Sequence, residues 1–478
     1  MTARSGHPTE LGDVAGRTAP TTPDPLPTSA WWDGLAPSGP ACTFALSSVR
    51  VTVRSNNQRV IDELAGYLGG HFPVTAGSSG PQPDWTVGIL DTPDPLAEGI
   101  GAEPVVLHDF GADKVVGTRS VRHPGTFTAA GGDCLIVADV ARRRITIAGQ
   151  YRAGSLYPHR EAALTGIAHE IIRHLIRLQL EFQGGLVVHA SAVGCRDQAL
   201  LVVGDKRAGK STLLTALLLH GGADYLAGDR VFLWPEPDPS GWLVAGWPTA
   251  LRLNPATAGI FAGLRAVADA ARHAGPPERE AGSRKLHIHP ADIPGLLAVP
   301  VRPVATLTTV LFLGTAVGQP STEVSEVSAE RGLGLIEPNL LTPHDPQHPN
   351  WLDLPRPSSR ALQAARQAFT GELGSSVRLL ELPVCGWTEQ ALAVQVGALR
   401  EKLGWPPAAP GAEDRQPAAA GPRGAVTVLT SARGPLVLPG RYPAPDGQQG
   451  TIEPDDPTDR GRSAPAENRH PTTGQDDD

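Results

Sequence analysis

The sequence predicts an α/β fold with a phosphate-binding core, a small α+β module before that core and a disordered tail at each end. Two observations lead to this prediction. A strand pattern at Ala199–Val203 runs into a glycine-bounded loop, and a helical pattern at Ser211–Leu219 follows the loop. Residues 1–40 and 406–478 are rich in Pro, Gly, Ser, Thr and Asp and lack hydrophobic periodicity, which is typical of disorder.

The composition excludes several classes of protein. A formal net charge of −8 argues against a protein whose main function is to neutralise nucleic-acid phosphates. The sequence begins without an apolar signal region, and no run reaches about 18 apolar residues, so we expect neither a signal peptide nor a membrane span. The four cysteines are scattered singly, which is typical of a reducing compartment rather than of disulfides or a metal site. We therefore expect a cytoplasmic protein that binds neither nucleic acid nor membrane.

The α+β module is predicted over residues 41–150. A helix is expected at Asn57–Phe72 because Val60, Leu64 and Leu68 repeat at helical spacing. Strands are expected at Ser48–Val53, Asp84–Leu90, Cys134–Val140 and Arg144–Ile147. The module contains no motif of catalysis, and packing or recognition of a partner is its expected role.

The core domain is predicted over residues 151–405 and opens with a helix at Arg160–Phe182. One face of that helix is apolar, and we expect His169 and His174 on its other face to lie at the surface. Further strands are predicted at Leu186–Val188, Leu307–Leu313 and Val377–Leu382, and helices at Ser358–Phe369 and Thr388–Leu403. A short run at Gly424–Leu438 in the second tail is apolar, but we do not expect it to fold.

The loop between strand and helix reads Gly204-Asp205-Lys206-Arg207-Ala208-Gly209-Lys210-Ser211-Thr212, which matches G-x-x-x-x-G-K-[ST]. Its backbone N–H groups are expected to cradle phosphates at a helix N-terminus. Lys210 would reach the β- and γ-phosphates, and Ser211 would hold Mg²⁺. The chain has only five lysines, and two of them, Lys206 and Lys210, fall in this loop. We therefore predict that the loop binds ATP with Mg²⁺.

Two further residues are expected beside the loop. Asp229 follows Lys210 by 19 positions, at the edge of a strand, where it is suited to hold Mg²⁺ or to take a proton from a hydroxyl. His189 precedes Lys210 by 21 positions at the end of another strand, and we expect it in the active site.

Downstream residues are candidates for substrate contacts. Trp247–Asn254 is expected as a strand that carries Arg252, which would contact the acceptor or form a surface salt bridge. The polar segment Arg272–Arg284 is a candidate lid that ends at Lys285, a further candidate for contact with nucleotide or substrate. His287 and His289 alternate on a strand, but they lack a third ligand at a usable spacing, so no metal site is expected there.

His189-Ala190, the GDKRAGKS loop and Ala227-Gly228-Asp229-Arg230-Val231 together resemble the HPr kinase/phosphorylase family. The resemblance covers about a tenth of the chain and looks closest to divergent members found with peptide natural-product pathways. It implies an ATP-dependent kinase that phosphorylates a serine or threonine hydroxyl of a peptide or small protein. Lys210, Asp229 and His189 would then be catalytic, and Arg230 would contact the substrate. Hexamers are typical of that family, so a homo-oligomer is a further expectation.

The chain departs from the family pattern at Gly228, where the family has the aspartate assigned as the base. Asp229 would then serve both functions, or His189 or Asp224 would supply the base. Alternatively, the protein binds nucleotide as a switch or scaffold with little transfer. The family's downstream glycine-rich segment is not found, so phosphorylase activity is not expected. A transporter-type ATPase is excluded because no L-S-G-G-Q signature follows the loop.

Overall fold

The computed structural model describes most of the chain between residues 39 and 406. The described ranges are 39–77, 82–92, 104–109, 114–119, 126–131, 134–152, 164–236, 241–273, 285–315, 323–345, 354–384 and 388–406, with the single residues 35, 350 and 352 and the strand backbones 427–430 and 433–437. Residues 1–34 and 438–478, which belong to the tails that we expect to be disordered, lie outside the described residues. Most of the candidate lid also lies outside them.

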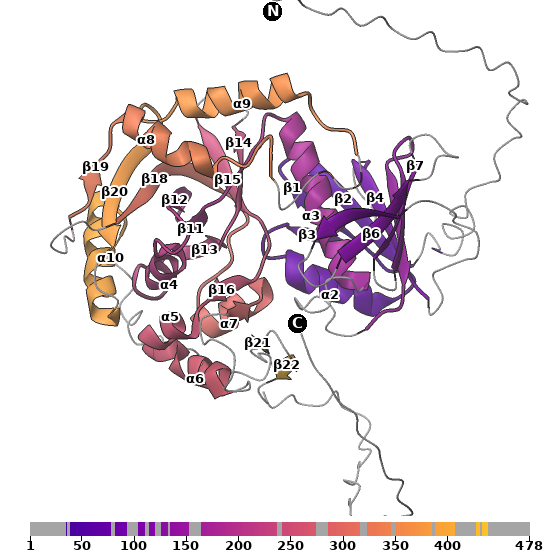
Figure 1. Cartoon of the computed structure of the whole chain (residues 1–478), viewed down its shortest axis with the longest axis horizontal. Helices are drawn as coiled ribbons and strands as arrows, with labels where there is room; N and C mark the ends of the chain where they lie inside the picture. Colours follow the sequence, from indigo (N-terminus) through magenta and orange to yellow (C-terminus); the bar gives the residue numbers. More distant parts are fainter. Residues whose placement is uncertain are drawn as a thin grey trace, which may run out of the picture. The chain divides into compact units, whose positions relative to one another are not determined.

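The first sheet is a mixed sheet of nine strands in the order β3-β1-β2-β4-β9-β8-β7-β6-β5 (Figure 1). Its strands are Ala41–Leu46 (β1), Val49–Ser55 (β2), Val74–Ala76 (β3), Trp85–Asp91 (β4), Pro104–Asp109 (β5), Lys114–Arg119 (β6), Thr126–Gly131 (β7), Cys134–Asp139 (β8) and Arg144–Gly149 (β9). The helices α2 (Gln58–Leu68) and α3 (Leu164–Phe182) pack against it. The predicted strands of the module are confirmed, and the predicted helix is confirmed with a shorter C-terminal end.

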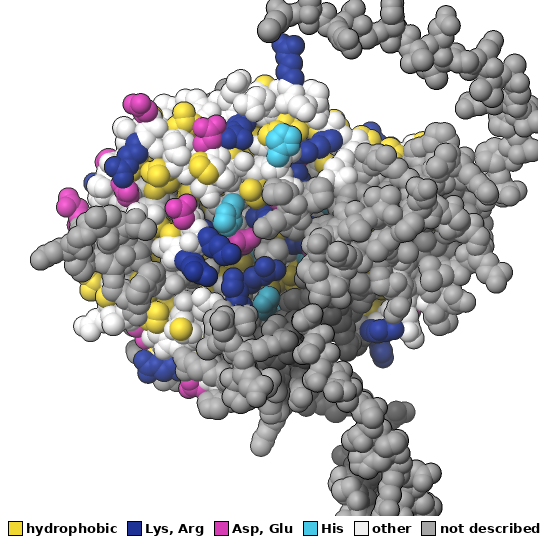
Figure 2. Space-filling view, in the orientation of Figure 1, with side chains coloured by type: hydrophobic (Ala, Val, Ile, Leu, Met, Phe, Trp, Pro, Cys, Tyr) yellow, Lys and Arg dark blue, Asp and Glu magenta, His cyan; other side chains and the backbone are white. Residues whose placement is uncertain are grey.

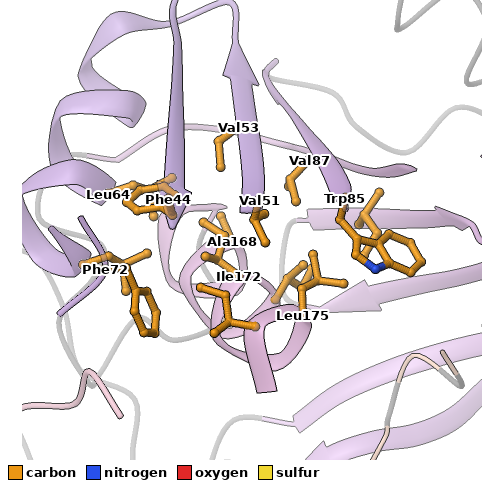
Figure 3. Packing of buried hydrophobic residues seen from close by; sticks show 14 of the residues in the cluster. Phe44, Val51, Val53, Leu64, Phe72, Trp85, Val87, Ala168, Ile172 and Leu175 are labelled. Carbon is orange, nitrogen blue, oxygen red and sulfur yellow. The ribbon is translucent and has the colours of Figure 1, made fainter. Parts of the chain in front are cut away.

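A hydrophobic cluster fills the space between this sheet and α3 (Figure 3). Val51 and Val53 of β2 alternate with polar residues, and they are fully buried with Ile172 and Leu175 of α3. The same cluster includes five residues at or beside strands of the second sheet, namely Val187, Phe232, Trp234, Ala245 and Trp247. The core therefore continues across the domain boundary that we predict at residue 150.

The second sheet has the order β10-β14-β15-β18-β12-β11-β13, and β20 pairs with β18 and β19 (Figure 1). Its strands are Leu186–Val188 (β10), Ser191–Cys195 (β11), Gln198–Val203 (β12), Asp224–Ala227 (β13), Val231–Pro235 (β14), Trp242–Gly246 (β15), Ala305–Thr315 (β18), Ser325–Glu326 (β19) and Arg378–Val384 (β20). β12, β18 and β20 run parallel, and the other pairs are antiparallel. The strands predicted at 186–188, 199–203, 307–313 and 377–382 are confirmed.

Helices cover both faces of this sheet, which explains why its parallel strands are nearly all apolar. Leu200 and Val202 of β12 face the cluster that contains α4 (Lys210–His220) and α10 (Glu389–Leu403). Leu201 and Val203 face a second cluster, to which α8 (Ala329–Ile336) contributes Ile336 and α9 (Ser359–Gly371) contributes Phe369. The described part of the chain is therefore a mixed α/β structure, as predicted.

Smaller elements lie between these layers and beyond the last helix. They are β16 (Leu251–Leu253), α5 (Pro255–Ile260), η2 (Ala262–Leu264), α6 (Arg265–His273), β17 (Leu286–Ile288), η4 (Pro290–Asp292), α7 (Ile293–Leu297), η5 (Glu337–Asn339), β21 (Thr427–Thr430) and β22 (Arg433–Val437). The strand expected at 247–254 is therefore limited to three residues. The run that we did not expect to fold forms the pair β21–β22, whose backbone lies beside β17 and α6.

The polar face of α3 is buried, which contradicts the surface position expected for His169 and His174. His169 Nε2 lies 3.3 Å from the Pro248 carbonyl oxygen, and His174 Nε2 lies 3.0 Å from Asn350 Oδ1. Burial lowers the pKa of each imidazole to about 3, and the charges of Arg173 and Arg177 respectively add to this effect. Both histidines are therefore neutral residues of an interface between α3 and distant parts of the chain.

Candidate active site

The glycine-bounded loop connects β12 to α4 in the strand–loop–helix order that the sequence predicts. Gly209 has φ 99° at the N-cap of α4, a left-handed conformation that glycine adopts without strain. At Gly204, a Cβ atom would lie 3.2 Å from the Cβ atoms of both Ala208 and Leu313, so the loop packs tightly against its own end and β18. The backbone conformation at Gly209 and the close packing at Gly204 therefore explain why glycine occupies both positions.

No side chain of the N-cap residue accepts a hydrogen bond from the backbone N–H groups at the start of α4. The N-cap Gly209 offers no side chain, and the first turn contains no acidic residue. Because the first N–H groups of a helix have no partner within the helix, an anion is favoured at this end. The first turn of α4 is therefore suited to receive phosphate oxygens.

Lys210 folds back over the loop. Its Nζ donates to the carbonyl oxygens of Gly204 at 2.6 Å and Asp205 at 3.2 Å. Burial lowers the pKa of the ammonium, and the negative charges of Asp229 and Asp205 partly oppose that shift. These carbonyl contacts hold the Lys210 ammonium within the phosphate loop.

His189 and Asp229 meet because two short connections cross at one corner of the sheet. His189 lies in the two-residue link between β10 and β11, and Asp229 lies in the three-residue link between β13 and β14. The pairing of β10 with β14 and of β11 with β13 brings the two links together. His189 Nε2 lies 3.4 Å from Asp229 Oδ1, and their side chains are 34% and 46% exposed. Since Ser191 of β11 is paired with Val202 of β12, the corner also adjoins the strand that enters the phosphate loop.

The electrostatics of this corner keep Asp229 ionised. Burial favours the neutral acid, but the hydrogen bond with His189 and the positive charges of Arg230 and Arg252 outweigh it. The pKa of Asp229 is therefore held well below its usual range. A carboxylate of such low basicity is better suited to binding a cation than to accepting a proton.

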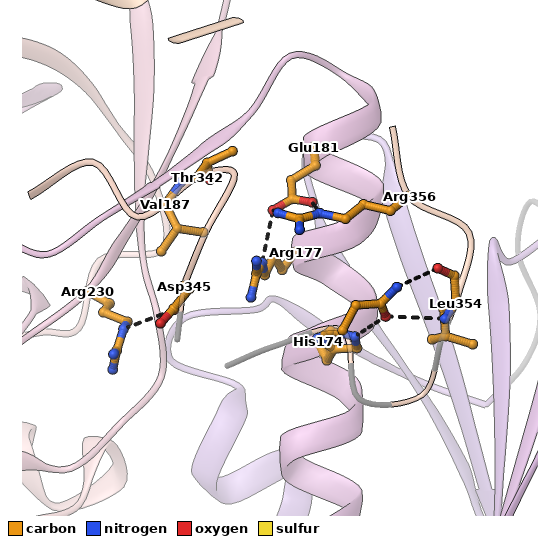
Figure 4. Close-up of polar contacts among 10 residues, drawn as sticks. His174, Arg177, Glu181, Val187, Arg230, Thr342, Asp345, Leu354 and Arg356 are labelled. Carbon is orange, nitrogen blue, oxygen red and sulfur yellow. Dashed lines mark hydrogen bonds and ion pairs between the residues drawn. The ribbon is translucent and has the colours of Figure 1, made fainter. Parts of the chain in front are cut away.

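Arg230 links this corner to a segment more than a hundred residues away in sequence (Figure 4). Its Nη1 lies 3.2 Å from Asp229 Oδ2, and its Nε lies 3.5 Å from Asp345 Oδ2. The Asp345 side chain is only 1% exposed. Arg230 therefore shares its charge between a carboxylate of the corner and a buried carboxylate behind it.

The crossing segment, defined as the described residues among 340–356, runs from this corner to α3 (Figure 4). It follows β10, because Val187 donates its N–H to Thr342 Oγ1 at 2.9 Å and accepts the N–H of Leu341 at 2.8 Å. At its far end, Arg356 donates to the Glu181 carboxylate of α3. Asp345 is thereby held in place by contacts on both sides.

β16 and β17 form an antiparallel pair, which we call the β16–β17 hairpin although α5 and α6 lie between the two strands in the chain. Arg252 lies on β16, Lys285 directly precedes β17, and both are exposed. The positive charge of Arg252 contributes to the low pKa of Asp229. Neither side chain forms an ion pair with a carboxylate in the described part of the chain, so the surface salt bridge considered for Arg252 is not seen there.

One sequence alternative is wrong. Asp224 lies at the opposite end of β13 from Asp229 and pairs with Arg302, whose Nε donates to it at 2.8 Å. Since a strand rises about 3.3 Å per residue, Asp224 lies too far from the corner to act on a substrate there. The remaining candidates for a base are therefore Asp229 and His189.

The structure also brings to the corner residues that the sequence did not single out. Ser191 donates its hydroxyl to the Gly228 carbonyl oxygen at 2.7 Å. His71, which follows α2, lies with Nε2 3.0 Å from the Leu226 carbonyl oxygen, three residues before Asp229. Burial lowers the pKa of His71 to about 4. Only the three-dimensional fold reveals these contacts, since they join positions far apart in the chain.

Within the described ranges, no group of three or more His, Cys, Asp and Glu side chains is arranged to hold a metal ion by itself. The described helices also lack the combination of length and apolar character that a membrane crossing needs. Cys42, Cys134 and Cys195 are buried and form no disulfide bond within the described residues.

No family model matches the chain, and no curated protein matches it. Among solved structures, the chain is similar to the HPr(Ser) kinase/phosphatase from Coxiella burnetii. The match has 15% sequence identity, covers 46% of this chain and 91% of that chain, and has a TM-score of 0.22.

Proposed function

We propose that the protein is an ATP-dependent kinase that transfers the γ-phosphoryl group to a serine or threonine hydroxyl of a peptide or small protein. One observation carries the proposal. The loop between β12 and α4 holds Lys210 Nζ against the carbonyl oxygens of Gly204 and Asp205, and the negative charge of Asp229 partly opposes the lowering of the Lys210 pKa by burial. Phosphoryl transfer needs positioning and charge neutralisation more than covalent chemistry, and this corner offers both.

The residues present fit ATP and Mg²⁺. The loop from Gly204 to Thr212 would bind the phosphates through its N–H groups and through Lys210. Ser211 and Asp229 offer the hydroxyl and carboxylate oxygens that Mg²⁺ prefers. Bound Mg²⁺ would neutralise the phosphate charge that develops during transfer.

In the proposed reaction, the acceptor oxygen forms a bond to the γ-phosphorus while the bond from that phosphorus to the β–γ bridging oxygen breaks. ADP is the leaving group. The hydroxyl proton would pass to His189 or to Asp229, the two basic side chains that meet at the corner. Arg230, Arg252 and Lys285 would contact the acceptor or the transferring group. We further propose a cytoplasmic location, a role in a bacterial peptide-modification pathway, and a homo-oligomeric state.

A second candidate function is favoured by Gly228. The residue lies outside the left-handed region, yet it carries no side chain at the corner where a second carboxylate would assist a base. The protein would then bind ATP as a switch or scaffold and transfer little phosphate. A Cβ at this position would lie 3.2 Å from Tyr225 Oη and 3.3 Å from Leu251 Cδ1, so Gly228→Asp requires only small shifts.

The test is incubation of the protein with Mg·ATP and the peptides encoded beside its gene, followed by mass spectrometry of each peptide. The kinase proposal predicts the mass gain of one phosphoryl group, which is absent with Lys210→Ala and Asp229→Ala. ATP binding without any phosphorylated peptide would contradict the kinase and support the switch. Absence of ATP binding would contradict both. Strongly increased transfer by Gly228→Asp would identify the natural protein as a weakened kinase.

A further inference from the structure

The β16–β17 hairpin has one apolar face and one cationic face. Leu251, Leu253, Leu286 and Ile288 are at most 2% exposed and pack in the cluster that contains α4. Side chains alternate across a strand, so the residues between and beside them point the other way. Arg252 and Lys285 are exposed on that opposite face, and His287 is half-buried. We call Arg252, Lys285 and His287 the hairpin face.

The register places the cations of the hairpin face side by side. Arg252 is paired directly with His287, and Lys285 is two residues from His287 on the same strand face. Lys285 is thus a diagonal neighbour of Arg252, at a Cα separation of about 7–8 Å. Two long cationic side chains at this spacing are able to bind carboxylates of one peptide segment.

The hairpin face adjoins the proposed transfer site. Leu251 Cα lies 3.6 Å from the position that a Cβ of Gly228 would take. Gly228 and Leu251 are the chain neighbours of Asp229 and Arg252 respectively, so the hairpin begins against the corner. The influence of the Arg252 charge on Asp229 agrees with this proximity. A substrate held on the hairpin face would therefore lie beside Asp229.

Arg252 and Lys285, the two long cations of the hairpin face, have no carboxylate partner within the described part of the chain. Arginines elsewhere form ion pairs there, including Arg302 with Asp224, Arg331 with Glu381 and Arg378 with Glu326. Arg252 and Lys285 form none there. In Figure 2, Lys, Arg and His side chains gather over the region of α4, β13 and β16. This local positive charge stands out in a protein whose formal net charge is −8.

We propose that the hairpin face binds acidic residues next to the acceptor hydroxyl, so that the substrate is an acidic peptide segment. This inference rests on the proposed kinase function and names its substrate class. Arginine binds carboxylates through two parallel hydrogen bonds, and lysine adds a second positive charge. An acidic peptide is favoured over nucleic acid, because two cations on a negatively charged protein are too few to bind a phosphate backbone strongly. The net charge would also repel acidic peptides from the rest of the surface.

The experiment measures binding of two synthetic peptides by fluorescence anisotropy, in the presence of Mg²⁺ and a non-hydrolysable ATP analogue. Both contain one central serine, which is flanked by glutamates in the first peptide and by glutamines in the second. The variants are Arg252→Glu and Lys285→Glu, with Arg360→Glu as the matched control. Arg360 lies on α9, is exposed and forms no ion pair in the described part of the chain. Thermal unfolding checks that each variant is folded.

We expect the natural protein to bind the glutamate peptide about tenfold more tightly than the glutamine peptide at low salt. Arg252→Glu and Lys285→Glu should each remove most of this preference, whereas Arg360→Glu should retain it and should bind the ATP analogue within about twofold of the natural protein. The double variant should prefer a lysine-flanked peptide. Equal binding of the first two peptides, or a preference that survives in Arg252→Glu, would overturn the inference. Because binding is measured without transfer, a peptide preference without phosphorylation would instead count against the kinase function alone.

Discussion

A chain of polar contacts runs through the residues of the corner, from His189 through Asp229 and Arg230 to Asp345. Each carboxylate is balanced by a cation next to it, and only the His189 and Asp229 end is substantially exposed. Asp345 therefore holds Arg230 in place, so that this cation does not fully capture Asp229. Because Asp345 acts through Arg230, it is a positioning residue for the proposed transfer.

Asp345→Asn tests this positioning role. Arg230 would retain Asp229 as its described carboxylate partner, and the closer pair would withdraw Asp229 from Mg²⁺. We expect transfer to fall about tenfold or more, a free energy of about 1.4 kcal/mol, with little change in the affinity for the nucleotide base and sugar. Steady-state kinetics separate kcat from KM, and Asp345→Glu, which keeps the charge, should restore part of kcat. A purely structural role would lower the amount of folded protein but leave kcat per folded molecule unchanged.

Asp292 provides a prediction about pH. Burial raises the pKa of this carboxyl from 3.8 to about 6 in the folded protein. A raised pKa in the folded state means that its contribution to stability is complete below about pH 4 and is lost as pH rises through about 6. Asp292→Asn should therefore raise the free energy of unfolding by about 1–3 kcal/mol at pH 7 and change it little at pH 4. Denaturant unfolding at the two pH values measures this, and an equal effect at both would contradict it.

The positions of the glycine-bounded loop, Asp229 and His189 at strand ends were predictable from the sequence because each belongs to a short pattern beside a strand, and their roles in catalysis stay predictions. The positions of Asp345 and His71 were not, since their partners lie more than a hundred residues away and no local pattern marks the pair. Asp224 was misjudged for a related reason. The sequence places it close to Asp229, but a strand separates the two and sends them to opposite ends of the sheet.

At the scale of elements, α3 shows why a polar helix face does not always face solvent. The helical spacing predicted its apolar face correctly, but the opposite face is buried through paired charges and hydrogen bonds. Glu181 is 1% exposed and accepts from Arg177 Nε at 2.9 Å and Arg356 Nε at 2.6 Å. Helical periodicity identifies the apolar face of a helix, but it does not predict whether the polar residues of the opposite face form buried hydrogen bonds and ion pairs.

Glu181→Gln tests how far this buried network stabilises the fold. The substitution removes the carboxylate that Arg177 and Arg356 share, so we expect a loss of about 3–5 kcal/mol in the free energy of unfolding. Hydrogen exchange should increase in the crossing segment and around Arg356. The matched control is Glu337→Gln, an ion-pair partner of Arg366 that is 58% exposed and should cost under about 1 kcal/mol. Equal losses in the two variants would contradict the assigned role of Glu181.

At the scale of the whole described structure, one apolar cluster contains residues of both sheets. Phe72 follows α2, and its ring centroid lies 6.4 Å from that of Phe232 in the second sheet, whose ring stacks on Trp247 at 5.1 Å. Composition alone indicated two blocks, because composition reports content along the chain and not packing between distant segments. The N-terminal module is therefore a structural partner of the corner.

This continuity predicts cooperative unfolding. Since separation of the sheets would expose part of one shared core, both should unfold in a single transition. Tryptophan fluorescence and far-ultraviolet circular dichroism should give coincident denaturant curves. A first transition that removes only the structure of residues 41–150 would contradict the shared core.

The most direct test of the central claim is transfer of labelled γ-phosphoryl from ATP to an acceptor peptide in a single turnover. We predict transfer by the natural protein, a loss of at least about a hundredfold with Asp229→Asn, and a comparable loss with Lys210→Ala. Both variants should remain folded, because Asp229 is 46% exposed and Lys210 is only half-buried at the start of α4. Transfer that persists in both variants, or tight Mg·ATP binding with no transfer to any acceptor, would contradict the proposed kinase.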